Sequence, residues 1–228
     1  MEHTFDMGYW DQIWSSDRAT AMNLSAPNPH LQIQVQDLSP GSAIDAGCGA
    51  GTEAIWLASQ GWTVTAADIA RAALEFGRER ADAAGLADRI EWVQADLSTW
   101  QPPANYDLVT THYAHPSIPQ LEFYKRIATW VAPGGTLLIV GHLHPDKFDK
   151  LDKFGHAHPH NHDHRVTNHR EHTHPPAEAS ATAVTITALL DPTSWHVVTA
   201  EESQRTMTDS SGLEKTLHDV VIHATRLS

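Results

Sequence analysis

The sequence of 228 residues lacks several features that would place it in a special class of protein. A single cysteine, Cys48, excludes an intrachain disulfide. The amino-terminal stretch lacks the basic region and apolar core of a secretion signal, and no apolar run approaches the roughly 18 residues that cross a bilayer. We therefore expect a cytoplasmic protein without a membrane partner.

Positive charge is also scarce. Fifteen Lys and Arg residues stand against 28 Asp and Glu residues, and the formal net charge of -13 opposes attraction to phosphate backbones. The 17 histidines make this balance depend on pH. We expect no nucleic-acid partner, and the 41% of hydrophobic residues is enough for the core of one domain over residues 1–228.

Short apolar runs alternate along the chain with segments of helical pattern. Strands are expected at 43–47, 62–67, 90–93, 106–110, 135–141, 195–199 and 217–225, and helices at 52–60, 70–84, 119–131 and 184–190. This alternation is typical of an α/β protein with a doubly wound, mostly parallel sheet and helices on both faces. The last two strands have no helix between them, which indicates an antiparallel hairpin at one edge.

Three glycines, Gly47, Gly49 and Gly51, follow the first expected strand. They let the backbone turn sharply and approach a ligand in the crevice at the carboxyl end of the strand. Thr52 stands where a dinucleotide-binding fingerprint needs its third glycine, and no phosphate-binding Gly-Lys-Ser/Thr sequence is present. Asp45 would repel a pyrophosphate but suits a ligand that carries an ammonium and a sulfonium.

Two more carboxylates stand at expected strand ends. Asp68 follows the second strand, where it can accept hydrogen bonds from a ribose diol, and Asp96 follows the third, where it can accept from an adenine amine. A lone strand-end Asp is more often a helix cap or a turn former. The ordered set of Asp45, the glycines, Asp68 and Asp96 is more specific, because all would face one crevice.

The sequences AIDAGCGAG, TAADI, QADL and VAPGGTLLIV together resemble the motifs of class I S-adenosylmethionine-dependent methyltransferases. The resemblance covers residues 40–142 and implies a Rossmann-like, seven-stranded sheet with an antiparallel last strand. It also implies methyl transfer from S-adenosylmethionine to a small-molecule or inorganic nucleophile. The segments around the glycine loop are most similar to a small bacterial subgroup resembling thiopurine and tellurite methyltransferases.

The resemblance also implies a set of cofactor contacts. Ile69 would pack on the adenine, and Leu97 would offer its backbone amide. The implied residues are Asp45, Gly47, Gly49, Asp68, Ile69, Asp96 and Leu97.

Residues outside these motifs are candidates for the rest of the site. His112 and His115 follow the fourth strand and could act as a catalytic base, or could merely pack over the cofactor or cap a helix; His112 is also a candidate cofactor contact. Trp10 and Trp14 have helical spacing, typical either of a lid or of a helix packed on the sheet. Because family members commonly cover the cofactor with this segment, residues 1–39 are predicted to form a helical lid.

A histidine-rich insertion is expected at 143–180. Its alternate histidines would lie on one side of an extended chain and suit zinc, nickel or copper: His156, His158, His160, His162 and His164. A solvated loop without selected chemistry explains them equally well. A metal-binding or metal-responsive protein that keeps a methyltransferase fold without turnover is therefore the alternative function. The identity of the acceptor and the oligomeric state stay open.

Overall fold

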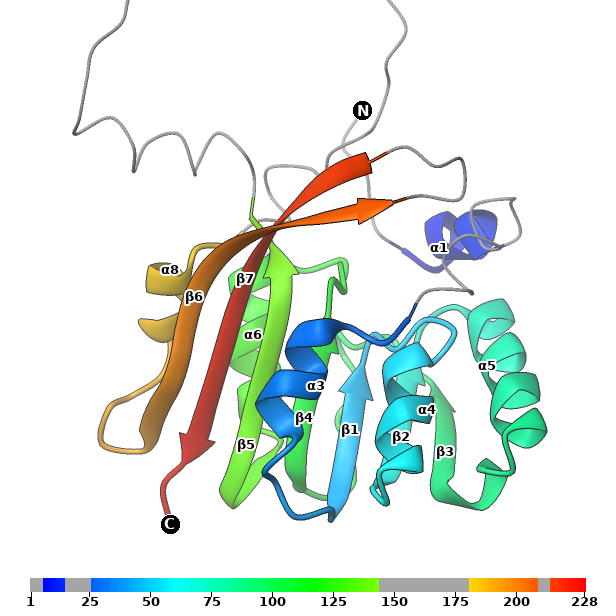
Figure 1. Ribbon diagram of the computed structural model, residues 1–228, viewed down its shortest axis with the longest axis horizontal. Helices are drawn as coiled ribbons and strands as arrows, with labels where there is room; N and C mark the ends of the chain where they lie inside the picture. Colours follow the sequence, from blue (N-terminus) through cyan, green and yellow to red (C-terminus); the bar gives the residue numbers. More distant parts are fainter. Residues whose placement is uncertain (1–5, 15–25, 144–180, 209–213) are drawn as a thin grey trace, which may run out of the picture.

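A computed structural model describes residues 6–14, 26–143, 181–208 and 214–228 (Figure 1). The strands are β1 (Ser42–Ala46), β2 (Thr63–Asp68), β3 (Ile90–Gln94), β4 (Tyr106–His112), β5 (Val131–His142), β6 (Trp195–Thr208) and β7 (Glu214–Arg226). The helices are α1 (Met7–Trp14), α3 (Pro29–Val35), α4 (Thr52–Ser59), α5 (Arg71–Ala83), α6 (Gln120–Ala128), α8 (Ala183–Thr187) and the short 3₁₀ turn η1 (Ala87–Arg89).

The strands form one seven-stranded sheet in the order β3-β2-β1-β4-β5-β7-β6. Strands β1 to β5 run parallel, whereas β7 pairs antiparallel with both β5 and β6. The predicted fold class is therefore confirmed, including the antiparallel hairpin at one edge. The strand order reverses beside β1, the point at which ligands bind in open α/β sheets.

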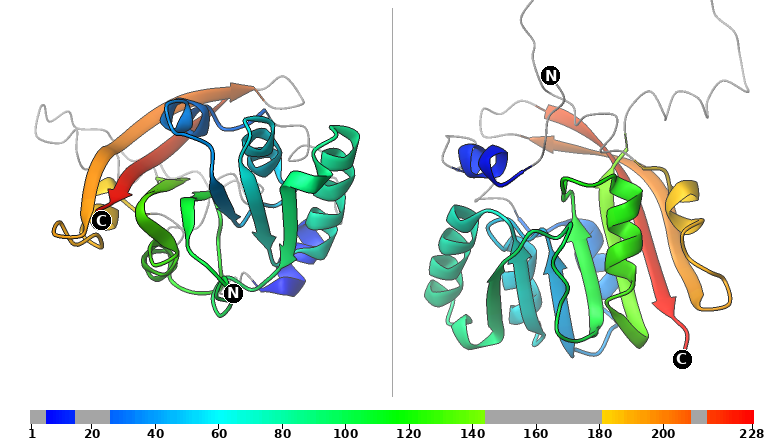
Figure 2. Two further views of the ribbon diagram at one scale, coloured as in Figure 1. Left: turned by 90° about the horizontal axis from the view of Figure 1, so that it is seen from below. Right: turned by 180° about the vertical axis from the view of Figure 1, so that it is seen from behind.

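Helices cover both faces of the sheet, as the view from below in Figure 2 shows. Alternate residues of the buried strands point to opposite faces, so each strand supplies two cores. Ile44 of β1 belongs to the core under α6 and α8, and its neighbour Ala43 belongs to the core under α3, α4 and α5. Within the described residues, no helix is long and apolar enough to cross a membrane.

Two predicted boundaries are wrong at the junction of α6 and β5. The helix expected at 119–131 ends at Ala128, and the strand expected to begin at 135 begins at Val131. Val131 pairs with Tyr106 of β4, and the register shifts between Tyr106 and Leu108. The apolar side chains of Trp130 and Val131 fit a helix face by pattern alone, but both are fully buried at the start of the strand.

The β6–β7 hairpin is longer than predicted. β6 runs from Trp195 to Thr208, far beyond the expected end at 199. The ladder between β5 and β7 ends at the pair His142 and Asp219, but β6 and β7 stay paired as far as Thr208 and Glu214. The end of the hairpin therefore extends past the carboxyl ends of the parallel strands, as Figure 1 shows.

Trp92 of β3 fixes the distance between α5 and the glycine loop. A Cβ atom added to Gly51 or to Gly77 would overlap the six-membered ring of Trp92, so the ring lies between the loop and the helix. A Cβ on Gly77 would also come within 3.1 Å of the Ala50 carbonyl oxygen. The indole cannot move away from one glycine without approaching the other.

We predict that Gly77→Ala destabilises the protein although glycine is a poor helix former. In a helix interior, alanine is normally favoured over glycine by about 1 kcal/mol, but overpacking a tight core costs about 1–3 kcal/mol. Because Trp92 is held from both sides, we expect a lower free energy of unfolding in urea. Glu79→Ala, an exposed change in the same helix, should leave it nearly unchanged. A more stable Gly77→Ala variant would contradict the packing argument.

Candidate active site

The three glycines of the loop each make room for a side chain from a different element. A Cβ on Gly47 would overlap the methyl group of Ala114, and one on Gly49 would lie 2.9 Å from the Trp14 ring. Gly51 faces Trp92 in the same way. All three glycines have positive φ angles, which other residues adopt only at a cost. The loop is thus enclosed by the turn after β4, by α1 and by β3.

Asp45 lies at the carboxyl end of β1 and is 1% exposed. Its Oδ1 lies 3.8 Å from Nδ1 of His112, at the end of the neighbouring strand β4. Among the described residues, neither Asp45 Oδ2 nor His112 Nδ1 has a hydrogen-bond partner. Buried polar atoms are nearly always paired, so this pair of atoms points to a missing polar ligand.

Glu53 in the first turn of α4 adds a further carboxylate at this edge. Its Oε1 accepts a hydrogen bond of 3.1 Å from the backbone N–H of Asn28. Burial raises the pKa of Glu53, the charge of His112 acts to lower it, and Asp45 adds to the increase. Sequence reasoning missed Glu53, which is indistinguishable by pattern from any acidic residue in the first turn of a helix.

Asp68 at the end of β2 holds the glycine loop. Its Oδ2 accepts from the Gly49 N–H at 2.8 Å, and its Oδ1 accepts from the Ala70 N–H at 2.8 Å. Burial raises the pKa of Asp68 to about 6, against the lowering effect of these backbone hydrogen bonds. Each carboxylate oxygen has two lone pairs, so both can still accept from a ligand hydroxyl.

The third strand end is placed as predicted but forms a local turn. Asp96 Oδ1 accepts from the backbone N–H and the hydroxyl of Ser98, at 2.9 and 2.6 Å. Leu97 is buried in the core, and the Ile69 carbonyl oxygen accepts from the Gln94 side chain at 3.3 Å. Asp96 therefore forms a local turn. This is the common role of a strand-end aspartate that does not bind a ligand.

The amino-terminal helix α1 lies beside α5 and the glycine loop. Trp14, at its end, packs against Gly49, and Trp10 packs edge-on against Tyr9 with 5.2 Å between ring centroids. Both tryptophans are partly exposed. Of the two, Trp14 is the one placed over the loop.

His112 and His115 have different surroundings. His112 faces Asp45, whereas the ring of His115 stacks on His142 at the end of β5, with centroids 5.3 Å apart. Burial lowers the pKa of His115, and it lowers the pKa of His142 to about 3. His142, which sequence reasoning assigned no role, thus forms a partly buried pair of neutral imidazoles with His115.

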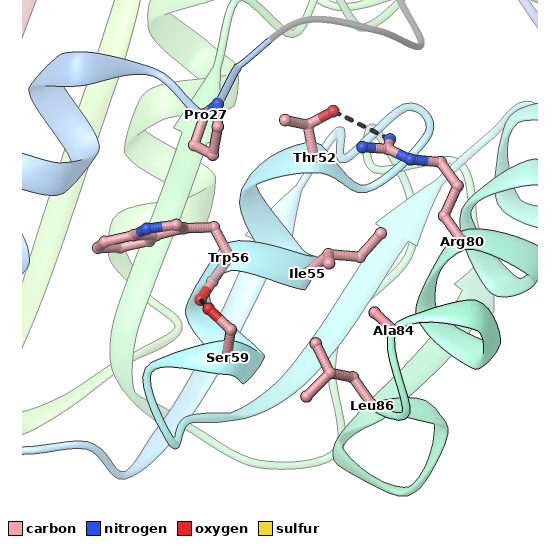
Figure 3. Close-up of a pocket in the computed structure, with 8 residues that line it drawn as sticks. All are labelled: Pro27, Thr52, Ile55, Trp56, Ser59, Arg80, Ala84 and Leu86. Carbon is pink, nitrogen blue, oxygen red and sulfur yellow. Dashed lines mark hydrogen bonds between the residues drawn. The ribbon is translucent and has the colours of Figure 1, made fainter.

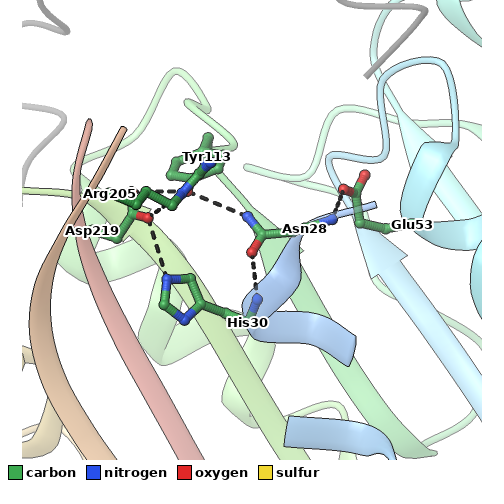
Figure 4. Close-up of polar contacts among 6 residues, drawn as sticks. All are labelled: Asn28, His30, Glu53, Tyr113, Arg205 and Asp219. Carbon is green, nitrogen blue, oxygen red and sulfur yellow. Dashed lines mark hydrogen bonds and ion pairs between the residues drawn. The ribbon is translucent and has the colours of Figure 1, made fainter. Parts of the chain in front are cut away.

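A polar network joins β4 to the hairpin and to the start of α3 (Figure 4). The Tyr113 hydroxyl donates to Asp219 Oδ1 at 2.9 Å and accepts from Arg205 Nη2 at 2.9 Å and from Asn28 Nδ2 at 3.3 Å. Arg205 Nε also donates to Asp219 Oδ2 at 2.6 Å. His30 Nε2 lies 3.3 Å from the same oxygen.

This network keeps a buried carboxylate charged. Asp219 is 0% exposed, and burial acts to raise its pKa. Hydrogen bonds from His30, Arg205 and Tyr113 outweigh burial and hold the pKa below its usual value. Burial raises the pKa of Tyr113 to about 12, so its hydroxyl keeps its proton at neutral pH.

A hollow of about 450 Å³ lies between α4 and α5 (Figure 3). Its lining includes Trp56, Leu86 and Arg80, and Arg80 donates to the Thr52 hydroxyl at 3.1 Å and to the Ala50 carbonyl at 3.0 Å. These two hydrogen bonds connect α5 to the end of the glycine loop and to the start of α4. The hollow contains none of the predicted site residues.

The predicted metal ligands, His156, His158, His160, His162 and His164, lie outside the described residues. Within the described ranges, no group of three or more His, Cys, Asp and Glu side chains is arranged to hold a metal ion. Metal binding by the histidine-rich segment stays a prediction.

Comparison with known proteins agrees with this geometry. Residues 43–135, from β1 into β5, match the sequence family described as a methyltransferase domain. The match covers a little less than half of the chain. It confirms the resemblance to class I S-adenosylmethionine-dependent methyltransferases inferred from the motifs.

The proteins that this chain resembles in sequence include plant and bacterial methyltransferases. The chain is 28% identical over 138 residues to a probable thiol methyltransferase 2 from Arabidopsis thaliana, covering 58% of this chain and 60% of that protein. It is 27% identical over 144 residues to thiocyanate methyltransferase 1 from Brassica oleracea, covering 60% and 63%. The chain therefore spans less than two thirds of the length of either relative.

The crystal structure of TehB from Haemophilus influenzae has a similar fold, with a TM-score of 0.66 at 18% identity, covering 96% of this chain and 66% of that one. Together with the thiol and thiocyanate methyltransferase relatives, this agrees with the predicted subgroup resemblance.

We predict that Asp68 makes stability depend on pH between about 4 and 6. The pKa of this carboxyl is about 6 in the folded protein and near 3.8 when unperturbed. Its contribution to the free energy of unfolding is therefore full below pH 4 and is lost as the pH rises through 6. Urea unfolding of the wild type and of Asp68→Asn at pH 4.5 and 7 measures this contribution. The titration of the other groups is common to both proteins and cancels in the difference between their free energies of unfolding. The wild-type advantage should shrink at pH 7; a constant difference would show that Asp68 titrates normally.

Proposed function

We propose that the protein transfers the methyl group of S-adenosylmethionine to a small, soft nucleophile. The observation that carries the proposal is the buried Asp45 Oδ2, which lacks a partner among the described residues beside a loop of three glycines. A carboxylate in this position suits an ammonium group and disfavours a phosphate. The methyltransferase match of residues 43–135 supports the same cofactor.

Each residue at the strand ends would contact a different part of the cofactor. Asp45 would accept hydrogen bonds from the ammonium group, and Asp68 would accept from the ribose hydroxyls while it holds the loop. Ile69, Asp96 and the backbone of Leu97 are proposed for the adenine side, with Trp10 and Trp14 as part of a lid. Bound S-adenosylmethionine would supply an activated methyl group, so the protein's part is mainly orientation and exclusion of water.

The acceptor side favours a nucleophile that needs little help to lose a proton. Burial lowers the pKa of both His115 and His142, which makes these imidazoles weak bases. A thiol, with an ordinary pKa of about 8.5, or an anion such as thiocyanate places a small demand on such a base. Relatives named as thiol and thiocyanate methyltransferases support this choice.

We predict that Asp45→Asn weakens S-adenosylmethionine binding by about 1.5–3 kcal/mol, the usual value of a hydrogen bond to a charged group. Calorimetric titration measures the change. Asp107→Asn is the matched control, because Asp107 lies at the opposite end of β4, where its Oδ2 accepts from the Ser42 N–H at 2.8 Å. Its affinity should equal that of wild type. Equal affinity in Asp45→Asn would remove Asp45 from the site.

We predict that replacing both His112 and His115 by Gln lowers turnover with a thiol by about 10²-fold, the lower end of the usual effect of a general base, because a thiol demands little of the base. Turnover with thiocyanate, which has no proton to lose, should fall little. His196→Gln, on exposed β6, is the control. An equal loss with both acceptors would assign the histidines to shaping the site, and a collapse of cofactor affinity would assign them to binding.

The alternative function, metal binding without turnover, is separated by the same assays. Product formed with any of a panel of small thiols, hydrosulfide or thiocyanate supports methyl transfer. Cofactor binding without product from any acceptor would favour the alternative, because a shared fold does not by itself establish an activity.

A further inference from the structure

We infer that Tyr113 is a positioning residue, whose hydroxyl holds the turn after β4 so that His112, Ala114 and His115 keep their places at the site. The inference rests on the proposed function, since it assigns these neighbours to the acceptor side of a methyl-transfer site. Neither the motifs nor the methyltransferase match gives Tyr113 a role.

The backbone of Tyr113 is strained. Its φ angle is 54°, and it is the one non-glycine residue with a positive φ in the part of the chain that the structure describes. A bulky residue adopts this left-handed conformation rarely, and such residues persist where the surrounding structure holds them. The Tyr113 N–H still donates to the Val140 carbonyl at 2.9 Å, so the chain leaves the sheet immediately after this bond.

The turn at Tyr113 sets the positions of its neighbours in the chain. Ala114 packs onto Gly47, so closely that a Cβ on the glycine would overlap it. His115 then stacks on His142, and the ring of Tyr113 also lies against His142, with 4.5 Å between the Tyr113 and His142 centroids. On the preceding side, His112 faces Asp45. A change in the turn would therefore move groups on both the cofactor and the acceptor sides.

The hydrogen bonds of the Tyr113 hydroxyl hold the turn in its conformation. Three elements remote in sequence meet at the Tyr113 oxygen: Asn28 before α3, Arg205 on β6 and Asp219 on β7. Asp219 is fully buried and Arg205 is fixed on it by a bond of 2.6 Å, so these partners have little freedom to shift. The hairpin therefore acts on the site through Tyr113.

The hydroxyl can be removed without the ring. In Tyr113→Phe, the contact with His142 can stay while all three hydrogen bonds are lost. We expect turnover with a thiol to fall about tenfold or more, since small misplacements of reacting groups are costly, with the KM for S-adenosylmethionine changing less than about threefold. Arg205→Lys should act in the same direction, because lysine lacks the fork that reaches both Asp219 and Tyr113.

A spectroscopic measurement tests the inference without turnover. The ring nitrogen resonances of His112 and the methyl resonance of Ala114, in the labelled full chain with and without S-adenosylmethionine, should shift in Tyr113→Phe and in Arg205→Lys. Tyr113→Phe keeps the aromatic ring and its contact with His142, so a shift at His112 or Ala114 reports movement of the turn. If no acceptor is methylated, the proposed function fails and these resonances still test the positioning role.

Tyr106→Phe is the matched control. The Tyr106 hydroxyl donates to the Thr65 hydroxyl at 3.1 Å in the buried interior, at the opposite end of the same strand. This variant loses one buried hydrogen bond where Tyr113→Phe loses three, so it should lose some stability but keep the His112 and Ala114 resonances and the turnover. Unchanged resonances in Tyr113→Phe, or losses of turnover that match Tyr106→Phe and track stability alone, would overturn the inference.

Discussion

The close approach of three side chains to one glycine loop is the constraint on which the site depends. Ala114, Trp14 and Trp92 each occupy the space that a side chain at Gly47, Gly49 or Gly51 would need. These contacts come from the turn after β4, from α1 and from β3, so the loop is positioned by the sheet and the amino-terminal helix together. Asp68 completes the enclosure from β2 by accepting the Gly49 N–H. A loop held in this way can present its backbone to a ligand with little further ordering.

The electrostatics of the edge follow from burial. Asp45, Glu53 and Asp68 lie close enough for their charges to interact, and burial raises the pKa of Glu53 and Asp68. The carboxylates differ in their partners: Asp68 and Glu53 accept backbone N–H groups, whereas Asp45 Oδ2 has none among the described residues. A cationic ligand would relieve the repulsion and satisfy that oxygen at once. The same ligand would be disfavoured at Asp219, whose charge Arg205 already balances.

Sequence periodicity and turn chemistry predicted the alternating strands and helices because those signals are local. The predicted end of α6 was wrong because the apolar residues Trp130 and Val131 suit a helix face as well as a strand. Only the pairing with β4 decides between the two. The length of β6 was missed because its second half is polar. That half pairs with β7 beyond the edge of the parallel sheet, where no core requires alternating apolar residues.

The candidate site also combines residues that local patterns predict with residues that they do not. The strand-end carboxylates and glycines belong to one continuous motif region, and the methyltransferase match ends at residue 135. The network around Tyr113 joins residues 85 to 106 positions apart, and Asp219 looks like one polar position in an apolar strand. Such contacts have no local pattern. Asn28, His142, Arg205 and Asp219 all lie outside the matched region of residues 43–135. Tyr113 lies inside that region and its hydroxyl bonds to Asn28, Arg205 and Asp219 outside it, so in the proposed site Tyr113 would connect the turn beside the glycine loop to the hairpin.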